Sequence, residues 1–290
     1  MKPARFDYYD PRTLAEAVAI RQEHGDESTV LAGGQSLMPM MNMRLARPVV
    51  VVDVNRVADS AYVRDWNGGV AIGMTTRQRM LMQHPLLTAR VPLLGEAAQY
   101  IGHPQIRSRG TVCGSLAHAD PAAELPTVAV ALDAQLVAAG PHGQRLIAAA
   151  DFFVDVYTTS LKPDEVLTEV RFPVLPADMV WSFLEVSRRH GDFAMVGAVT
   201  GIAVDQARNV ITGARLVFCG VGATPRRVVE AENALLGQAP GEAAFAAAAA
   251  LVSQGVDPHN DLHASVAYRR SVAGTLTKRG LAQALATLAA

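Results

Sequence analysis

Apolar positions in the first part of the chain switch between continuous strand-like runs and helical spacing. Thr13 suits the cap of a helix that continues to about His24, because the apolar residues after it recur every three to four positions. The run Pro48–Val54 is uniformly apolar and β-branched, which is typical of a strand buried on both faces. The same patterns predict strands at Thr29–Ala32, Val70–Ile72, Gln135–Ala139, Arg145–Ala148 and Val166–Phe172, and helices at Thr76–Gln83, Leu86–Tyr100 and Ala122–Leu132.

The pattern changes after Pro173 and Pro176, which are the best candidates for a domain boundary. Three strand-like segments separated by turn residues then indicate a three-stranded antiparallel sheet at Trp181–Ser187, Ala194–Asp205 and Val210–Cys219. Helical spacing dominates the remainder, at Pro225–Leu236, Glu242–Gln254 and Ala264–Leu288. We therefore predict an α+β protein with a first domain over residues 1–176 and a second over 177–290.

Composition and charge exclude several classes of protein. The 290 residues are 50% hydrophobic and 18% charged, which supports a large core and argues against disorder. The 26 basic and 27 acidic residues lack the basic excess of a nucleic-acid-binding protein. The two cysteines, Cys113 and Cys219, are too few for a disulfide framework, structural zinc or an iron–sulfur cluster.

The expected location is the cytoplasm. Low cysteine usage suits a reducing compartment, and the first residues, MKPARFDYYD, contain no apolar segment of a secretory signal. The longest apolar tract, around Phe245–Val252, is far shorter than the ~20 residues of a membrane span, so no membrane span is expected.

A strand leads directly into the segment Ala32–Leu37 (AGGQSL), which we call the first glycine loop. Glycine permits a positive φ and lets the backbone approach a ligand closely. Consecutive exposed N–H groups then form a nest that binds phosphate, to which Ser36 can add a hydroxyl donor. The same residues also fit a simple tight turn after a strand, and the sequence leaves both readings open.

A second segment of small residues, Gly110–Ser115 (GTVCGS), is the second glycine loop, within a stretch predicted as loop over Gly102–Pro121. Asp120 fits an N-cap of the helix that follows. Glu124 fits the third position of that helix, or a hydrogen bond to the hydroxyls of a ribose or ribityl chain. Neither loop matches the P-loop or the GxGxxG pattern. Two phosphate-binding loops in one domain fit a dinucleotide held between them.

Four ordered segments resemble the FAD-binding medium subunit of three-subunit molybdenum hydroxylases, the xanthine dehydrogenase and aerobic carbon monoxide dehydrogenase family. They are AGGQSL at 32–37, IRSRGTVCGSLAHADPAAELP at 106–126, SRRHGDFAMVG at 187–197 and YRRSVAGTL at 268–276. The resemblance covers nearly the whole chain. It implies a vanillyl-alcohol-oxidase-type FAD-binding domain in two lobes, about 1–56 and 57–176, followed by a small C-terminal domain over 177–290.

The resemblance implies that backbone amides of the two glycine loops hold the FAD pyrophosphate and that Glu124 supplies a carboxylate. It further implies apolar contacts from Ile101, Leu167 and Leu184 and an aromatic contact near the flavin ring from Phe193. No catalytic residue and no metal ligand is expected in this chain. The full set expected to bind FAD is Ala32, Gly33, Gly34, Gln35, Ser36, Leu37, Ile101, Gly110, Thr111, Val112, Cys113, Gly114, Ser115, Asp120, Glu124, Leu167, Leu184 and Phe193.

The second glycine loop departs from the family at one position, since Cys113-Gly114 stands where a glycine pair is usual. A positive φ at Cys113 would cost roughly 1 kcal/mol or more. Either this residue has an ordinary φ or the loop is shifted. A small buried cysteine is usually inert packing, and a reactive thiol beside the flavin is the alternative.

The resemblance also implies partners. A large subunit would carry the molybdenum cofactor and hydroxylate the substrate, and a small subunit would carry two [2Fe–2S] clusters. Electrons would pass through FAD in this chain to an external acceptor, in a dimer of heterotrimers. Two other functions stay open: a self-sufficient flavin-dependent oxidoreductase of the same fold superfamily, and a non-catalytic nucleotide-binding scaffold subunit. The sequence identifies neither the substrate nor the acceptor.

Overall fold

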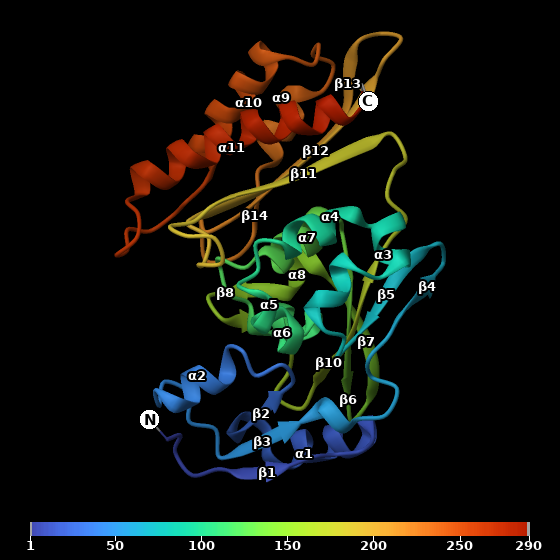
Figure 1. Cartoon of the computed structure of the whole chain (residues 1–290), viewed down its shortest axis with the longest axis vertical. Coiled ribbons are helices and arrows are strands. Elements are labelled where there is room, and N and C mark those ends of the chain that lie inside the picture. Colours follow the sequence, from blue (N-terminus) through green and yellow to red (C-terminus); the bar gives the residue numbers. More distant parts are fainter. Residues whose placement is uncertain (1, 289–290) are drawn as a thin grey trace.

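The computed structural model describes residues 2–288, which form three layers stacked along the long axis of the molecule (Figure 1). The layer that contains the N-terminus is a parallel sheet of order β1-β3-β2, with strands β1 (Asp7–Tyr9), β2 (Ser28–Leu31) and β3 (Val50–Asp53). Helix α1 (Leu14–His24) connects β1 to β2 and starts at the predicted cap. The Thr13 hydroxyl accepts a hydrogen bond from the Glu16 backbone N–H at 3.2 Å, and the Glu16 carboxylate accepts one from the Thr13 backbone.

The middle layer is a five-stranded antiparallel sheet of order β4-β5-β10-β6-β7. Its outer strands form two hairpins, and the late strand β10 enters between them, so it pairs with segments far away in the sequence. The strands are β4 (Val63–Trp66), β5 (Gly69–Gly73), β6 (Gln135–Gly140), β7 (Gly143–Ala148) and β10 (Val166–Phe172). Two very short strands, β8 (Phe153–Asp155) and β9 (Thr158–Thr159), pair separately.

Helices cover this middle sheet and connect its two hairpins. They are α3 (Pro85–Arg90), α4 (Pro92–Ala98), α5 (Pro104–Arg109), α6 (Val112–His118) and α7 (Glu124–Ala131), and α8 (Ala149–Phe152) follows β7. Helix α2 (Leu37–Asn42) belongs instead to the N-terminal layer, where it lies between β2 and β3 in the chain. Three 3₁₀ turns accompany them, at Gly25–Glu27, Val54–Arg56 and Gln78–Met82.

The third layer is an antiparallel sheet of order β11-β12-β13-β14 under three helices. Its elements are β11 (Met179–Val186), β12 (Val196–Asp205), β13 (Val210–Cys219), β14 (Arg226–Arg227), α9 (Val229–Leu235), α10 (Glu242–Gly255) and α11 (Val266–Thr287). The three long strands were predicted to within two residues, and the two-residue β14 adds a fourth strand that the pattern did not indicate.

The sheet of the third layer is buried on both faces, and this joins the layers. Phe183, Val199 and Val217 lie opposite one another in register and belong to the core of the middle layer. Their strand neighbours Ala198 and Phe218 point to the other face and belong to the core formed with α9, α10 and α11. Because side chains alternate along a strand, one sheet closes both cores.

The helical region between Thr76 and Leu132 differs most from the sequence-based prediction. The loop predicted over Gly102–Pro121 is wrong, since α5 and α6 occupy most of it. Pro104 is the first residue of α5, and Thr111 is the N-cap of α6. Residues that are typical of a loop therefore mark the starts of helices. The helix predicted at Leu86–Tyr100 is two helices, because Pro92 starts a new one.

Candidate functional site

A cavity of about 790 Å³ lies among segments of all three layers. Its volume falls in the range of ~300–1,000 Å³ that is usual for ligand sites. The first glycine loop forms one wall and the second glycine loop with the start of α7 forms another. Segments 157–167 and 191–193 complete the lining. The cavity therefore collects residues that are more than 150 positions apart in the sequence.

The first glycine loop leaves an unusual number of backbone donors unused. None of the N–H groups from Gly33 to Leu37 donates a hydrogen bond to another residue within 2–288. Gly34 has a φ of 70°, the left-handed conformation that glycine adopts without steric cost. Five successive unbonded N–H groups in a cavity-lining loop are a donor set suited to the oxygens of a phosphate or pyrophosphate.

The second glycine loop has a different geometry from the one expected. Thr111 caps α6, and its hydroxyl accepts a hydrogen bond from the Gly114 N–H at 3.1 Å. The Val112 N–H donates to the Thr76 carbonyl at 3.0 Å, and the Ser115 N–H donates to the Thr111 carbonyl at 3.2 Å. Most of the amides of this loop are therefore already satisfied inside the chain. Its contribution to the cavity is small side chains and close backbone approach.

The two loops touch each other through their glycines. A Cβ on Gly33 would lie 2.6 Å from the Gly110 Cα and 2.7 Å from the Arg109 carbonyl oxygen. A Cβ on Gly110 would in turn lie 2.5 Å from Oε1 of Gln78. This carboxamide oxygen is buried, lines the same cavity and has no hydrogen-bond partner within 2–288. Gln78 was not identified from the sequence, because nothing local marks it.

Two expected carboxylates line the cavity in different ways. Asp120 does not cap α7: its Oδ1 accepts the Ala122 N–H at 2.9 Å and its Oδ2 accepts the Tyr157 hydroxyl at 3.3 Å. Glu124 is the first residue of α7, not the third, so the capping-box interpretation is wrong. Its side chain is only 8% exposed, and burial raises its pKa to about 7. Glu124 is therefore a cavity-lining carboxyl that titrates near neutral pH.

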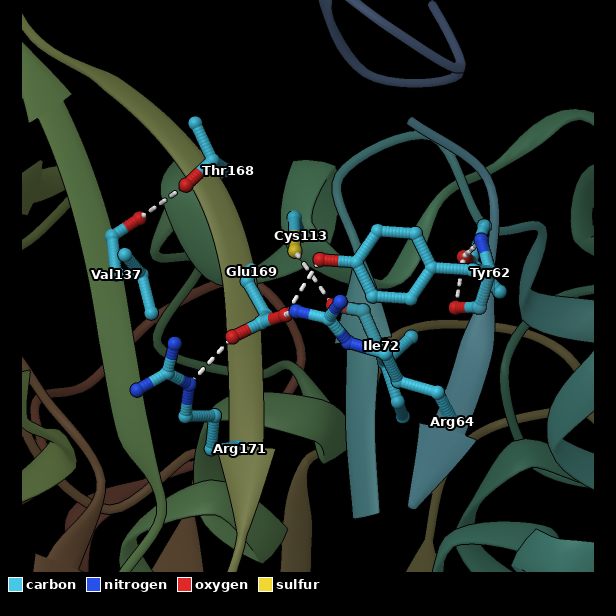
Figure 2. Close-up of polar contacts among 9 residues, drawn as sticks. Tyr62, Arg64, Ile72, Cys113, Val137, Thr168, Glu169 and Arg171 are labelled. Atoms are coloured by element: carbon cyan, nitrogen blue, oxygen red, sulfur yellow. Dashed lines mark hydrogen bonds and ion pairs between the residues drawn. The ribbon is translucent and has the colours of Figure 1, made fainter. Parts of the chain in front are cut away.

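Cys113 lies inside α6 with an ordinary φ, so the departure from a glycine pair causes no backbone strain. Its side chain is 2% exposed and packs beside Glu169, as Figure 2 shows. Burial, and then the Glu169 charge, raise the pKa of the Cys113 thiol well above its usual range. A thiol that keeps its proton is a poor nucleophile, so the geometry fits packing and not a reactive thiol.

The residues expected to bind FAD line this cavity, with two exceptions. Val112 is fully buried in the core on the opposite side of the short helix α6. Leu184 points to the α10–α11 face of the third sheet, one strand position away from Phe183 on the cavity side. Side chains alternate between the two faces of a strand. An error of one residue in a short local match therefore assigns Leu184 to the wrong face. Phe193 lines the cavity with 72% of its side chain exposed.

Several cavity residues have no local signature in the sequence, among them Arg21 and Lys162. Asn55 does not line the cavity, but it follows a parallel strand at its carboxyl end and contacts the first glycine loop. Ligands bind at that end of parallel sheets, so a polar residue there is a signal that the sequence offered. Its side-chain Nδ2 donates to the Ala32 carbonyl at 2.7 Å and so supports the first glycine loop.

The fold and this site define a nucleotide-binding protein in which two glycine-containing loops from separate lobes meet at one cavity. Residues 4–175 match the family described as "FAD binding domain in molybdopterin dehydrogenase", and residues 181–284 match "CO dehydrogenase flavoprotein C-terminal domain". The chain belongs to this family of FAD-binding subunits of molybdopterin dehydrogenases. The cavity residues fit the cofactor, since the unbonded amides suit its pyrophosphate.

Characterised relatives match over almost their full length. The chain is 42% identical over 285 residues to the 6-hydroxypseudooxynicotine dehydrogenase complex subunit alpha of Paenarthrobacter nicotinovorans, covering 98% of this chain and 96% of that one. It is 35% identical to the carbon monoxide dehydrogenase medium chain of Hydrogenophaga pseudoflava, covering all of both. The solved structure of carbon monoxide dehydrogenase from Hydrogenophaga pseudoflava superimposes with a TM-score of 0.95, over 99% of each chain at 37% identity.

No helix within residues 2–288 is long and apolar enough to cross a membrane. Both cysteines are buried free thiols.

Proposed function

We propose that this chain is the FAD-binding electron-transfer subunit of a three-subunit molybdenum hydroxylase. The observation that carries the proposal is the row of five unbonded N–H groups from Gly33 to Leu37 in a cavity of about 790 Å³. Family membership and the names of the relatives, which are subunits of dehydrogenases, support the same function. Those names contain different substrates, which supports a substrate choice made in another subunit.

The residues of this chain bind and orient the cofactor, which supplies the redox chemistry when bound. The amides of the first glycine loop hold the pyrophosphate, and the second glycine loop permits close approach. Glu124 and Asp120 are placed to accept hydrogen bonds from cofactor hydroxyls or ring N–H groups. Ile101, Leu167 and Phe193 supply apolar surface. Electron transfer requires no general base, so no residue here is assigned as catalytic.

The proposed complex has a large subunit with the molybdenum cofactor and a small subunit with two [2Fe–2S] clusters. We further propose a dimer of such heterotrimers, an external electron acceptor and a cytoplasmic location. We also propose the division into an FAD-binding domain over 1–176 and a C-terminal domain over 177–290. Support for this division comes from the two family matches, which end at 175 and begin at 181.

The first test is the visible spectrum of the purified full chain, followed by identification of the nucleotide released by acid. A flavin spectrum with FAD in the supernatant, at about one per chain, is the expected result. A colourless protein that also fails to quench the fluorescence of added FAD would overturn the proposal and leave the scaffold function. Turnover of an organic substrate by the flavin-loaded chain alone would instead favour the self-sufficient oxidoreductase.

Capture of partners tests the second part of the proposal. Co-purification with a molybdenum-containing and an iron–sulfur-containing chain is expected, and the native mass of the complex would show whether two heterotrimers associate. Photoreduced iron–sulfur clusters should then bleach the flavin absorbance at 450 nm in the complex (roughly the flavin maximum). A complex that assembles and yet shows no electron transfer to the flavin would contradict the function.

A further inference from the structure

The third sheet presents a row of three residues to the FAD-binding domain. Glu185, Gly197 and Cys219 are paired across β11, β12 and β13, on the face that carries Phe183 toward the middle layer. A Cβ on Gly197 would lie 2.5 Å from the Cys219 Sγ and 4.0 Å from the Glu185 Cγ. Gly197 therefore leaves room for the Cys219 thiol beside the Glu185 side chain, on a sheet that packs against helices α4 and α7.

The Glu185 carboxyl has no partner of its own. Both of its oxygens are buried, and neither has a hydrogen-bond partner within residues 2–288. A buried carboxyl without hydrogen bonds is costly when charged, so it holds a proton instead. The carboxyl group that acts on it most strongly is Glu124, which lines the cavity from the start of α7. Glu124 is itself only 8% exposed and forms no ion pair within residues 2–288, although a hydrogen bond from its own backbone acts to lower its pKa.

Among residues 2–288, no positively charged group contributes to the pKa of either carboxyl. The titratable groups that face them are Asp120 before α7, Tyr100 after α4, and Cys219 on β13, with Glu96 of α4 next to Tyr100. Burial, and then the charge on Glu124, raise the pKa of Glu185 to about 8, and burial raises that of Glu124 to about 7. Two interacting carboxyls of this kind titrate as a pair, and near neutral pH they hold about one proton between them.

We propose that Glu124 and Glu185 act as one proton-binding pair at the cavity wall, and that this pair takes up a further proton when the flavin in the cavity is reduced. This inference rests on the proposed function. Two electrons from an iron–sulfur partner add negative charge to the cavity, and that charge favours the neutral form of a neighbouring carboxyl. A proton from water then forms an O–H bond on the carboxylate. The same proton returns to water when the acceptor removes the two electrons.

The test is the midpoint potential of the FAD-loaded full chain between pH 6 and 9.5. Each proton bound together with two electrons adds about 30 mV per pH unit to the slope. We expect the wild type to show this extra slope in a window near pH 7–8. The window should vanish in the double variant Glu124→Gln/Glu185→Gln and narrow to the region near pH 7 in Glu185→Gln, because only Glu124 then titrates. Glu96→Gln, which removes a half-buried carboxyl that does not line the cavity, should keep the window.

A second measurement does not depend on FAD. Infrared titration of the flavin-free chain should show two carboxyl groups, those of Glu124 and Glu185, that deprotonate above pH 6. Both signals should be lost in the double variant. The control Glu96→Gln should keep both and lose only a signal that belongs to Glu96 itself. Equal potential slopes in wild type and double variant would overturn the proton uptake, and an absence of titrating carboxyls would overturn the pair. A wild type that binds no FAD would contradict the proposed function, and the infrared result would still decide the pair.

Discussion

Arg77 donates a hydrogen bond from Nη2 to Oδ1 of Asn55 at 2.7 Å, and this contact joins the two glycine loops. Asn55 holds the first loop through the Ala32 carbonyl at 2.7 Å. Arg77 holds the second loop through the Arg109 carbonyl at 2.6 Å. Asn55 follows a strand of the N-terminal layer, whereas Arg77 precedes the 3₁₀ turn of the middle layer. The relative position of the loops thus depends on two side chains outside both.

Removal of this link should weaken FAD binding. Arg77→Leu loses two hydrogen bonds of about 0.5–1.5 kcal/mol each, which corresponds to a rise of roughly tenfold in the FAD Kd. The Kd is measured by flavin fluorescence quenching. Arg79→Leu is the matched control, because Arg79 is exposed two residues away and should bind FAD as wild type does. An unchanged Kd in a folded Arg77→Leu chain would show that the loops hold their places without the link.

A methyl group at the contact of the glycine loops should be poorly tolerated. In Gly33→Ala the new Cβ meets backbone atoms of Gly110 and Arg109, which have no flexible end to move aside. Overpacking of this kind costs about 1–3 kcal/mol, so we expect a loss of FAD affinity of roughly 5- to 150-fold. Gly241→Ala serves as control, since nothing lies within 4 Å of its Cβ position. Equal FAD affinity in the two variants would contradict the loop geometry.

The Tyr62–Glu169 hydrogen bond should make stability depend on acid pH (Figure 2). Burial alone would raise the pKa of Glu169, but hydrogen bonds from Tyr62, Arg171 and Arg64 lower it overall. A lowered folded-state pKa stabilises the protein above the unfolded value, about 4.3 for Glu, and this stabilisation is lost as the pH falls through the folded-state value.

Tyr62→Phe removes one bond to this charged group and should lower the free energy of unfolding at pH 7 by about 1.5–3 kcal/mol. The difference from wild type should shrink as the pH falls through the lowered folded-state pKa of Glu169, where this carboxyl becomes protonated. Urea unfolding of wild type and variant at pH 7 and at acid pH measures this difference in the free energy of unfolding. Tyr268→Phe, which changes an exposed side chain, is the control. A difference that stays the same at both pH values would show that the Glu169 charge is not responsible.

The two cysteines should not react in the folded protein. Burial raises the pKa of both thiols above the usual range, and the side chains are at most 2% exposed. A thiol-specific disulfide reagent at pH 8 should therefore label no thiol in the native chain and two in denaturant. Rapid native labelling that Cys113→Ser abolishes would restore the alternative of a reactive thiol beside the flavin.

Local sequence patterns predicted most elements correctly where the structure depends on a single residue type at one position. Thr13 and Glu16 form the capping box over a single helical turn, and Gly34 adopts the positive φ that its loop requires. The helices α5 and α6 were missed because proline, threonine and glycine mark both loops and helix starts. A local pattern cannot distinguish these two uses, since the choice depends on what the following helix packs against.

The sequence by itself determined the family, the α+β class and the positions of both glycine loops, because these depend on short segments and on strand or helix periodicity. Tertiary structure decided which residues reach the cavity. Strand alternation turns Leu184 away from the middle layer and Glu185 toward it, and the packing of three layers brings Glu185 near Glu124 and Arg77 to Asn55. Burial and charge–charge coupling act through space, so the titration of Glu124 near neutral pH follows only from the folded arrangement.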